Sequence, residues 1–224
     1  MIIEPVLKRA VAFIDGQNLY YAIRDCFHYT YPNYDVNALA RRICELRGCS
    51  LVQTRFYTGI PDQADDATWH EYWARKMAEM GRLGVITFAR SLRYRKKTVK
   101  ITDRSEFRFL VGEEKGVDVR IAIDMIRLAH TKTYDAAFIF SQDQDLSEVA
   151  AEIKTIGIEQ QRWIEVVCAF PKSTKSANQR GINNTKWLPF DKQLYDQCLD
   201  PVDYRGAMDR KTEIKKMHGE KTNT

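Results

Sequence analysis

Long apolar runs are missing from this sequence, and their absence excludes several classes of protein. Glu4 and Pro5 interrupt the first residues before an apolar stretch could reach the length of a signal peptide. No later segment approaches the roughly 18 apolar residues from which a membrane-spanning helix is built. We therefore expect a soluble protein of the cytoplasm that does not associate with a membrane.

Cysteine is also scarce, and its spacing does not fit a zinc site or a disulfide framework. The 224 residues include five cysteines, an odd number, and no two of them have Cys-x-x-Cys spacing. The one close pair, Cys44 and Cys49, has no histidine near it. We predict reduced thiols at all five positions, several of them in the core. These positions are Cys26, Cys44, Cys49, Cys168 and Cys198.

Neither sign of charge dominates the composition. The formal net charge is +5 and the pI is near 8.9, a mild basic excess that permits a polyanionic partner without requiring one. Apolar residues make up 44% of the chain, and no repeat or break in composition divides it. We predict a single domain over residues 1–190 and a C-terminal extension over 191–224, with a loose charged tail from about residue 205.

Five short apolar segments, each bounded by polar residues, are typical of strands buried on both faces of a sheet. They are Ala10–Ile14, Leu51–Tyr57, Val85–Phe88, Ala136–Phe140 and Ile164–Phe170. Helical spacing of apolar residues appears between them. The sequence therefore predicts a three-layer α/β fold, with a parallel Rossmann-like sheet and helices on both faces. The later stretch through Trp187 and Phe190 is predicted to pack as a closing helix.

Aspartates stand where two of these strands end. Asp15 follows the first strand and Asp143 follows the fourth, with Asp145 two residues further on. The ligand crevice of an open parallel sheet lies at the carboxyl ends of its strands, so these acids are candidates for a site. Helix capping is the alternative for Asp145, and equally for Asn18, but it does not account for Asp143.

A further acid, Asp118, is predicted to face inward from the first turn of a helix that runs from Val117 to about His130. The residues within about 60° of Asp118 on this helix are apolar, namely Ile121, Ala122, Met125 and Ala129. An unpaired buried carboxylate is costly, and a helix N-terminus or a cation shared with other acids would offset that cost. Asp124 lies among arginines instead and is predicted to belong to a surface ion pair.

Four acids without histidine or cysteine form a candidate metal site. Asp15, Asp118, Asp143 and Asp145 meet at one sheet edge if the first and fourth strands are neighbours. Such hard oxygen ligands favour Mg2+ or Mn2+ over zinc. A pair of carboxylate-held divalent ions suits phosphodiester hydrolysis, because one ion activates water while the other stabilises the leaving oxygen.

Residues 90–104 carry seven positive charges against a single acid, Asp103. Apolar residues alternate with polar ones from Leu92 to Val111, which predicts a hairpin inserted at about residues 90–111. A solvated basic loop is the alternative. Interleaving of the charges with an aromatic residue favours contact with a nucleic-acid backbone. The candidate contacts within the hairpin are Arg93, Tyr94, Arg95, Lys96 and Lys97.

Three blocks of sequence resemble the signature blocks of the NYN domain, a branch of the PIN-like nuclease superfamily. They are Phe13–Leu19 (FIDGQNL), Lys115–Val119 (KGVDV) and Ser141–Leu146 (SQDQDL). The resemblance extends over about residues 8 to 170 and is greater to the bacterial LabA-like members. It covers neither the basic hairpin nor the chain beyond Pro171.

The resemblance implies a PIN-like, metal-dependent ribonuclease fold in which the four acids hold the metal. By the same resemblance, Asn18 positions a carboxylate or the substrate, and Ser141 supports the turn after its strand. Lys115 and the basic hairpin would then hold the RNA backbone, while Tyr94 or Phe107 would stack on a base. RNA is favoured over DNA as the partner, and a homodimer is left open.

Three functions therefore compete. The first is a divalent-metal endoribonuclease that cuts single-stranded or loop RNA by in-line attack of water. The second is a non-catalytic regulatory module of the same fold that binds RNA or a protein. The third is a nucleotidyl or sugar-nucleotide transferase that uses Asp143 and Asp145. It is weakened by the lack of a glycine-rich phosphate loop and by Asp118, for which it has no use.

Overall fold

The computed structural model describes residues 2–100, 106–113, 115–174 and 176–206. Six strands form one parallel sheet in the order β3-β2-β1-β6-β7-β8. Their bounds are β1 Lys8–Asp15, β2 Cys49–Ile60, β3 Ile86–Ser91, β6 Ala136–Phe140, β7 Glu165–Pro171 and β8 Lys186–Phe190. The predicted α/β class is confirmed, and β1 and β6 pair directly, as the convergence of the acids requires.

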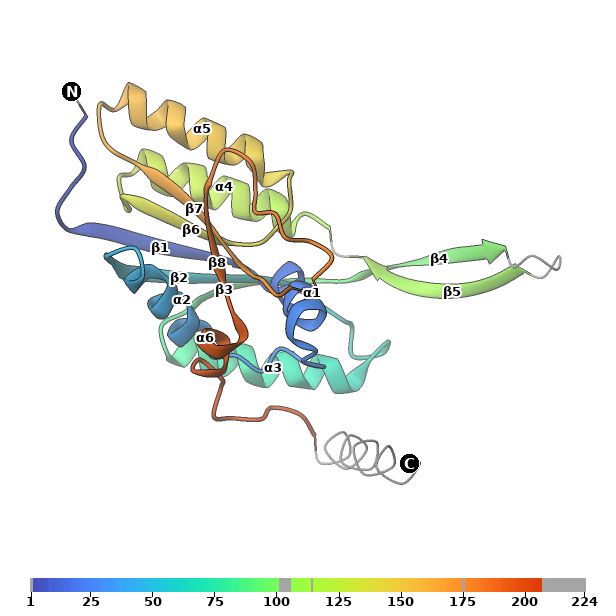
Figure 1. The fold of residues 1–224 in the computed structure, drawn as a ribbon. Helices are drawn as coiled ribbons and strands as arrows, with labels where there is room; N and C mark the ends of the chain where they lie inside the picture. The colour runs from blue at the N-terminus through green and yellow to red at the C-terminus, as the bar shows by residue number, and fades with distance from the viewer. Residues whose placement is uncertain (1, 101–105, 114, 175, 207–224) are drawn as a thin grey trace.

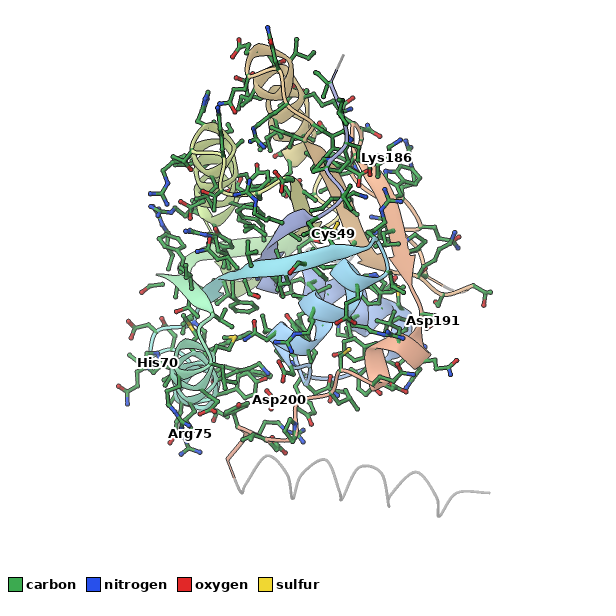
Figure 2. All side chains as sticks on the ribbon, turned by 90° about the vertical axis from the view of Figure 1, so that its left-hand side faces the viewer. Cys49, His70, Arg75, Lys186, Asp191 and Asp200 are labelled. Atoms are coloured by element: carbon green, nitrogen blue, oxygen red, sulfur yellow. The ribbon has the colours of Figure 1, made fainter. Side chains whose placement is uncertain are left out.

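All five predicted strands are present, and the sixth corrects the expected closing helix. β8 pairs in parallel with β7 from Val167–Lys186 to Pro171–Phe190, at the edge of the sheet. An edge strand tolerates Pro189, which a helix interior would not. Figure 2 marks the limits of this strand, with Lys186 at its start and Asp191, the N-cap of the next helix, just past its end.

Helices cover both faces of the sheet (Figure 1). Their bounds are α1 Gly16–Phe27, α2 Val36–Glu45, α3 Ala67–Arg82, α4 Val117–His130, α5 Leu146–Glu159 and α6 Lys192–Asp196. β1 supplies both core layers, because successive side chains of a strand point to opposite faces. Ala10 and Ile14 belong to the cluster under α1, α2 and α3, whereas Val11 and Phe13 belong to the cluster under α4 and α5.

The start of α1 differs from the sequence-based alternative that Asn18 is its cap. The helix begins at Gly16, and its N-cap is Asp15, the last residue of β1. A side chain at position 16 would not fit, because a Cβ there would lie 2.4 Å from Cζ of Phe56. Glycine thus allows the helix to start directly at the strand tip, which fixes where the Asp15 carboxylate lies.

Strands β4 (Arg93–Lys100) and β5 (Glu106–Glu113) pair with each other in an antiparallel two-stranded sheet. Figure 1 shows this ribbon extending away from the main sheet. It leaves the body after Leu92, whose amide donates to the carbonyl oxygen of Ile60. It returns just before Lys115 at the start of α4. Of residues 93–100 and 106–113 only the backbone is described.

The C-terminal segment up to residue 206 packs against the body. Buried Lys76 of α3 donates to the Tyr34 carbonyl oxygen and to Oδ2 of Asp200, both at 2.9 Å. Asp200 is labelled in Figure 2. Tyr195 and Tyr204 join the core cluster under α1, α2 and α3. Most of the predicted loose tail, residues 207–224, lies outside the described residues.

The structure bears on two predictions from composition, the state of the cysteines and the lack of a membrane-spanning helix. All five cysteines are free and buried, as expected of thiols that fill a core. Within the described ranges, no helix has the length and apolar character needed to cross a bilayer.

Candidate functional site

A cavity of about 480 Å3 opens at the carboxyl edge of the sheet, between α1 and the start of α4. We call it the acid pocket. Its lining includes three of the four predicted acids, Asp15, Asp118 and Asp143, together with Asn18 and Lys115. Residues from three remote parts of the chain therefore meet at the position expected for ligand binding in a parallel sheet.

Asp15 is the most buried of these acids, with 8% of its surface exposed. Oδ1 accepts the Asn18 amide at 3.0 Å, and Oδ2 accepts the Ser141 hydroxyl at 3.2 Å. Burial raises the pKa of Asp15 to about 6, although both hydrogen bonds act in the opposite direction. The negative charges of Asp143 and Asp118 raise this pKa further. Asp143 and Asp118 are therefore each close enough to Asp15 to disfavour its charged form.

The tips of β1 and β6 are tied together by Asn18 and Ser141. Oδ1 of Asn18 accepts the backbone amide of Gln142 at 2.8 Å. The Ser141 hydroxyl oxygen accepts the amide of Asp143 at 3.2 Å while its proton goes to Asp15. Both side chains thus hold the loop that carries Asp143 against the tip of β1.

Asp143 and Asp145 differ in their surroundings. Oδ1 of Asp143 accepts the Asp145 amide at 3.0 Å, which shapes the turn before α5. Asp145 occupies the N-cap position, but its side chain makes no capping bond there. It is exposed and lies outside the lining of the acid pocket. The structure thus brings together three of the four predicted metal ligands.

Asp118 lies in the first turn of α4, two residues after the N-cap Gly116, whose φ is 76°. Its side chain is partly exposed to the acid pocket. The sequence placed it in the middle of the apolar face, and this placement needs correction. Val117 and Leu128 are also buried, which moves the centre of the buried face towards Ile121, about 60° away. Asp118 therefore stands at the margin of that face.

The prediction that Asp124 pairs with neighbouring arginines is confirmed, because Arg120 and Arg127 contact its carboxylate at 3.2 and 3.3 Å, but the predicted surface location is wrong. Its side chain is buried rather than part of a surface pair, with 1% exposure. Oδ2 accepts Nη1 of Arg55 at 2.8 Å and the hydroxyl of Tyr57 at 3.0 Å. Arg55 comes from β2, a partner that helical spacing alone could not reveal. The pair attaches α4 to the sheet and so holds Asp118 in place.

The oxygen atoms that line the acid pocket suit a divalent cation in chemical type but are not yet grouped around one position. Three carboxylates in one cavity are the hard oxygen ligands that Mg2+ and Mn2+ prefer, and a cation would relieve their mutual repulsion. However, in the part of the chain that the structure describes, no three His, Cys, Asp or Glu side chains form a group that could hold a metal ion. The residues fit the ion by chemistry, and their side chains would have to draw together around it.

Positive charge surrounds the acids. Lys115 lines the acid pocket itself. The guanidinium of Arg90 lies beside Gly116, where an added Cβ would be 3.1 Å from Nη1. The predicted contact residues Arg93, Tyr94, Arg95, Lys96 and Lys97 belong to β4. Their side chains lie outside what the structure describes.

Sequence reasoning missed other residues of the acid pocket, in particular Gln17 and Tyr21 of α1 and Val119 of α4. One signal could have indicated Tyr21. It lies three residues after Asn18, so the two side chains share a helix face.

Three comparisons with known proteins bear on the family of the chain. No curated protein matches the chain. A solved structure of a protein of unknown function from Vibrio parahaemolyticus is 18% identical, covers 91% of this chain and 99% of its own, and has a TM-score of 0.44. The structure of MurG from Acinetobacter baumannii is 9% identical, covers 81% of this chain and 45% of its own, and has a TM-score of 0.30. The NYN domain model matches residues 9–184, a range that includes every acid of the pocket. The chain therefore belongs to the NYN domain family, a group of PIN-like nucleases.

Proposed function

We propose that this NYN domain is a divalent-metal-dependent endoribonuclease of the LabA-like branch. The observation that carries the proposal is the meeting of Asp15, Asp118 and Asp143 in one cavity beside Lys115. Negatively charged carboxylates that share a cavity repel one another, and a purely structural role would not offset the free energy of that repulsion. A bound divalent cation does.

The residues of the acid pocket take distinct roles in this proposal. Asp15, Asp118 and Asp143 hold Mg2+ or Mn2+, and Asp145 reaches the ion from the rim or through water. A bound divalent cation supplies a lowered pKa for water and charge that stabilises a leaving phosphate oxygen. Asn18 and Ser141 hold the β1 and β6 tips in register. Lys115 neutralises a substrate phosphate.

The polyanionic partner is RNA rather than DNA. The ribbon of β4 and β5 supplies Arg93, Arg95, Lys96 and Lys97 for the phosphates and Tyr94 for a base. Support comes from the position of the ribbon, because β5 ends two residues before Lys115 of the acid pocket. A strand bound along the ribbon would therefore reach the acids.

A cleavage assay tests the proposal. Mixed-sequence single-stranded RNA is incubated with the protein in Mg2+ or Mn2+, and the Asp143→Asn variant is compared with Glu148→Gln. Glu148 is an exposed acid in the first turn of α5, outside the acid pocket, and serves as the matched control. We expect Asp143→Asn to lose cleavage and Glu148→Gln to keep it. Metal-dependent cleavage by Asp143→Asn at the wild-type rate would refute the assignment.

A non-catalytic RNA- or protein-binding module is the second candidate. It is favoured by one observation, that the three acids of the pocket do not form a ready metal-binding group among the described residues. Calorimetric titration with Mn2+ separates the two functions. A nuclease binds the ion and cuts mixed RNA, whereas a binding module retains RNA without cutting it.

A further inference from the structure

A second cavity lies beside the acid pocket and has a different lining. Its volume is about 280 Å3, and its walls include Tyr20, Tyr21, Arg24, Trp69, Trp73 and Leu92. We call it the aromatic pocket. Gln17 and Tyr21 line both cavities, so the two are adjacent and share a wall on α1.

We propose that the aromatic pocket receives an unstacked nucleobase of a single-stranded RNA whose phosphate lies in the acid pocket. RNA as the ligand rests on the proposed function. The base subsite itself rests on the second cavity, whose rings the nuclease assignment does not use. A volume of about 280 Å3 lies just below the range of pockets for drug-sized ligands, about 300–1,000 Å3, and suits a single base.

Tyr21 is the residue best placed to stack on that base. It is 46% exposed although its ring is large and apolar, and it stands where the two cavities join. The guanidinium carbon of Arg24 lies 4.8 Å from the centre of the Tyr21 ring. The ring centres of Tyr20 and Tyr21 are 5.5 Å apart. Tyr21 is therefore supported from its own helix, while an exposed part of its surface remains available to a base.

Another wall comes from α3, whose two tryptophans pack against neighbouring aromatic rings. Asp66 caps this helix by accepting the Trp69 amide at 3.0 Å. Trp69 packs edge-on against Tyr72 with ring centres 5.0 Å apart. Trp73 is buried and packs against Phe56. Fixed aromatic rings lose little freedom on binding, so they form an efficient stacking surface.

Polar groups between and within the walls supply directional contacts. Gln17 carries an amide with both a donor and an acceptor at the junction of the cavities. Thr58 and Asp66 add a hydroxyl and a carboxylate to the lining. A cavity that combines four aromatic residues with a few polar groups is the composition expected where a base is stacked and its edge is hydrogen-bonded.

The two connections of the β4–β5 ribbon lead to the two cavities. Leu92, immediately before β4, lines the aromatic pocket, and Lys115, shortly after β5, lines the acid pocket. A nucleic-acid strand that follows the basic ribbon would therefore meet both. This continuity favours a nucleotide of the same strand over a separate small molecule as the occupant.

Binding without cleavage tests the proposal. Fluorescence anisotropy is measured with no divalent metal present, using a labelled mixed-sequence 12-nucleotide RNA and a matched abasic ribose-phosphate oligomer. The proteins compared are the wild type, Tyr21→Ala and Tyr21→Phe, with Ile158→Ala as the control. Ile158 is a 69% exposed apolar side chain on α5, outside both cavities.

The wild type is expected to bind the base-bearing RNA more tightly than the abasic oligomer. Tyr21→Ala should weaken RNA binding roughly 10- to 100-fold, the range for one lost stacking partner, and leave the abasic oligomer unaffected. Tyr21→Phe and Ile158→Ala should match the wild type. Equal binding of both oligomers, no binding of either, or an unchanged affinity in Tyr21→Ala would overturn the base subsite.

The cleavage assay separates this inference from the proposed nuclease function. If Tyr21→Ala cleaves RNA in the presence of metal with the wild-type KM and kcat, the base subsite is overturned and the nuclease function stands. The opposite outcome is also possible: Tyr21→Ala loses base-dependent binding, but the wild type cuts no RNA with Mg2+ or Mn2+. That outcome would overturn the nuclease function and leave the base subsite intact.

Discussion

Replacement of Asp15 by asparagine should make the metal-free protein more stable at neutral pH. The pKa of Asp15 is raised from 3.8 to about 6, mainly by burial. That difference corresponds to roughly 3 kcal/mol by which folding disfavours the charged carboxylate. An asparagine oxygen can still accept the Asn18 amide. The changed contact with Ser141 costs about 1 kcal/mol, so the net gain is about 2 kcal/mol.

The raised pKa of Asp15 also determines how the stability difference between the two proteins changes with pH. A raised native pKa means that the folded protein holds a proton on Asp15 more tightly than the unfolded chain does. The stabilisation that the neutral carboxyl provides is fully present below about pH 4 and is lost as the pH rises through about 6. Relative to the wild type, Asp15→Asn should therefore be less stable by about 1 kcal/mol near pH 4, gain stability between pH 4 and 6, and keep an advantage of about 2 kcal/mol above that range.

Urea denaturation in EDTA measures the effect. The free energy of unfolding is compared for the wild type, Asp15→Asn and the control Glu148→Gln at half-unit steps from pH 4.5 to 8. The control removes an exposed charge, so its difference from the wild type should stay near zero. Loss of stability in Asp15→Asn at pH 7.5, or a gain that does not depend on pH, would refute the reasoning.

Three further perturbations test how the site is held and loaded. Gly16→Ala should lower the free energy of unfolding by about 1–3 kcal/mol, because its Cβ would collide with Phe56. The control Gly81→Ala in α3 has open space around its Cβ and should not destabilise the protein. Asp124→Ala should lower the free energy of unfolding by about 3–5 kcal/mol, because it leaves Arg55 buried without its ion-pair partner. A decrease below about 1 kcal/mol in urea denaturation would contradict this. Mn2+ affinity measured by calorimetry should fall below about pH 6, where a proton competes on Asp15; a flat profile would exclude Asp15 as a ligand.

The strands were predictable because a parallel sheet demands uninterrupted apolar runs. Ala136–Phe140 is a strand with the predicted limits, and Asp15 and Asp143 stand at adjacent tips as expected. β8 was not predictable by the same rule. It is an edge strand that carries Pro189 and has exposed residues, so its apolar content resembles that of a short helix. Its pairing with β7 depends on tertiary contact.

The site was predictable as far as local spacing reaches. Resemblance to the family named the acids, but helical periodicity placed Asp118 and Asp124 wrongly relative to the buried face. For Asp118 the error arose because Val117 and Leu128 are also buried, and for Asp124 because it pairs with Arg55 of β2, a contact between elements that leaves no periodic signal. Tyr21 was missed because its importance comes from two cavities that form only when α3 and α4 pack beside α1.

Diffraction from crystals soaked in Mn2+ tests the central claim most directly. Anomalous density should appear in the acid pocket, with carboxylate oxygens of Asp15, Asp118 and Asp143 at coordination distance from one ion. Manganese bound elsewhere, or held without Asp118, would contradict the account, because the sheet edge and α4 would then not form a common metal centre.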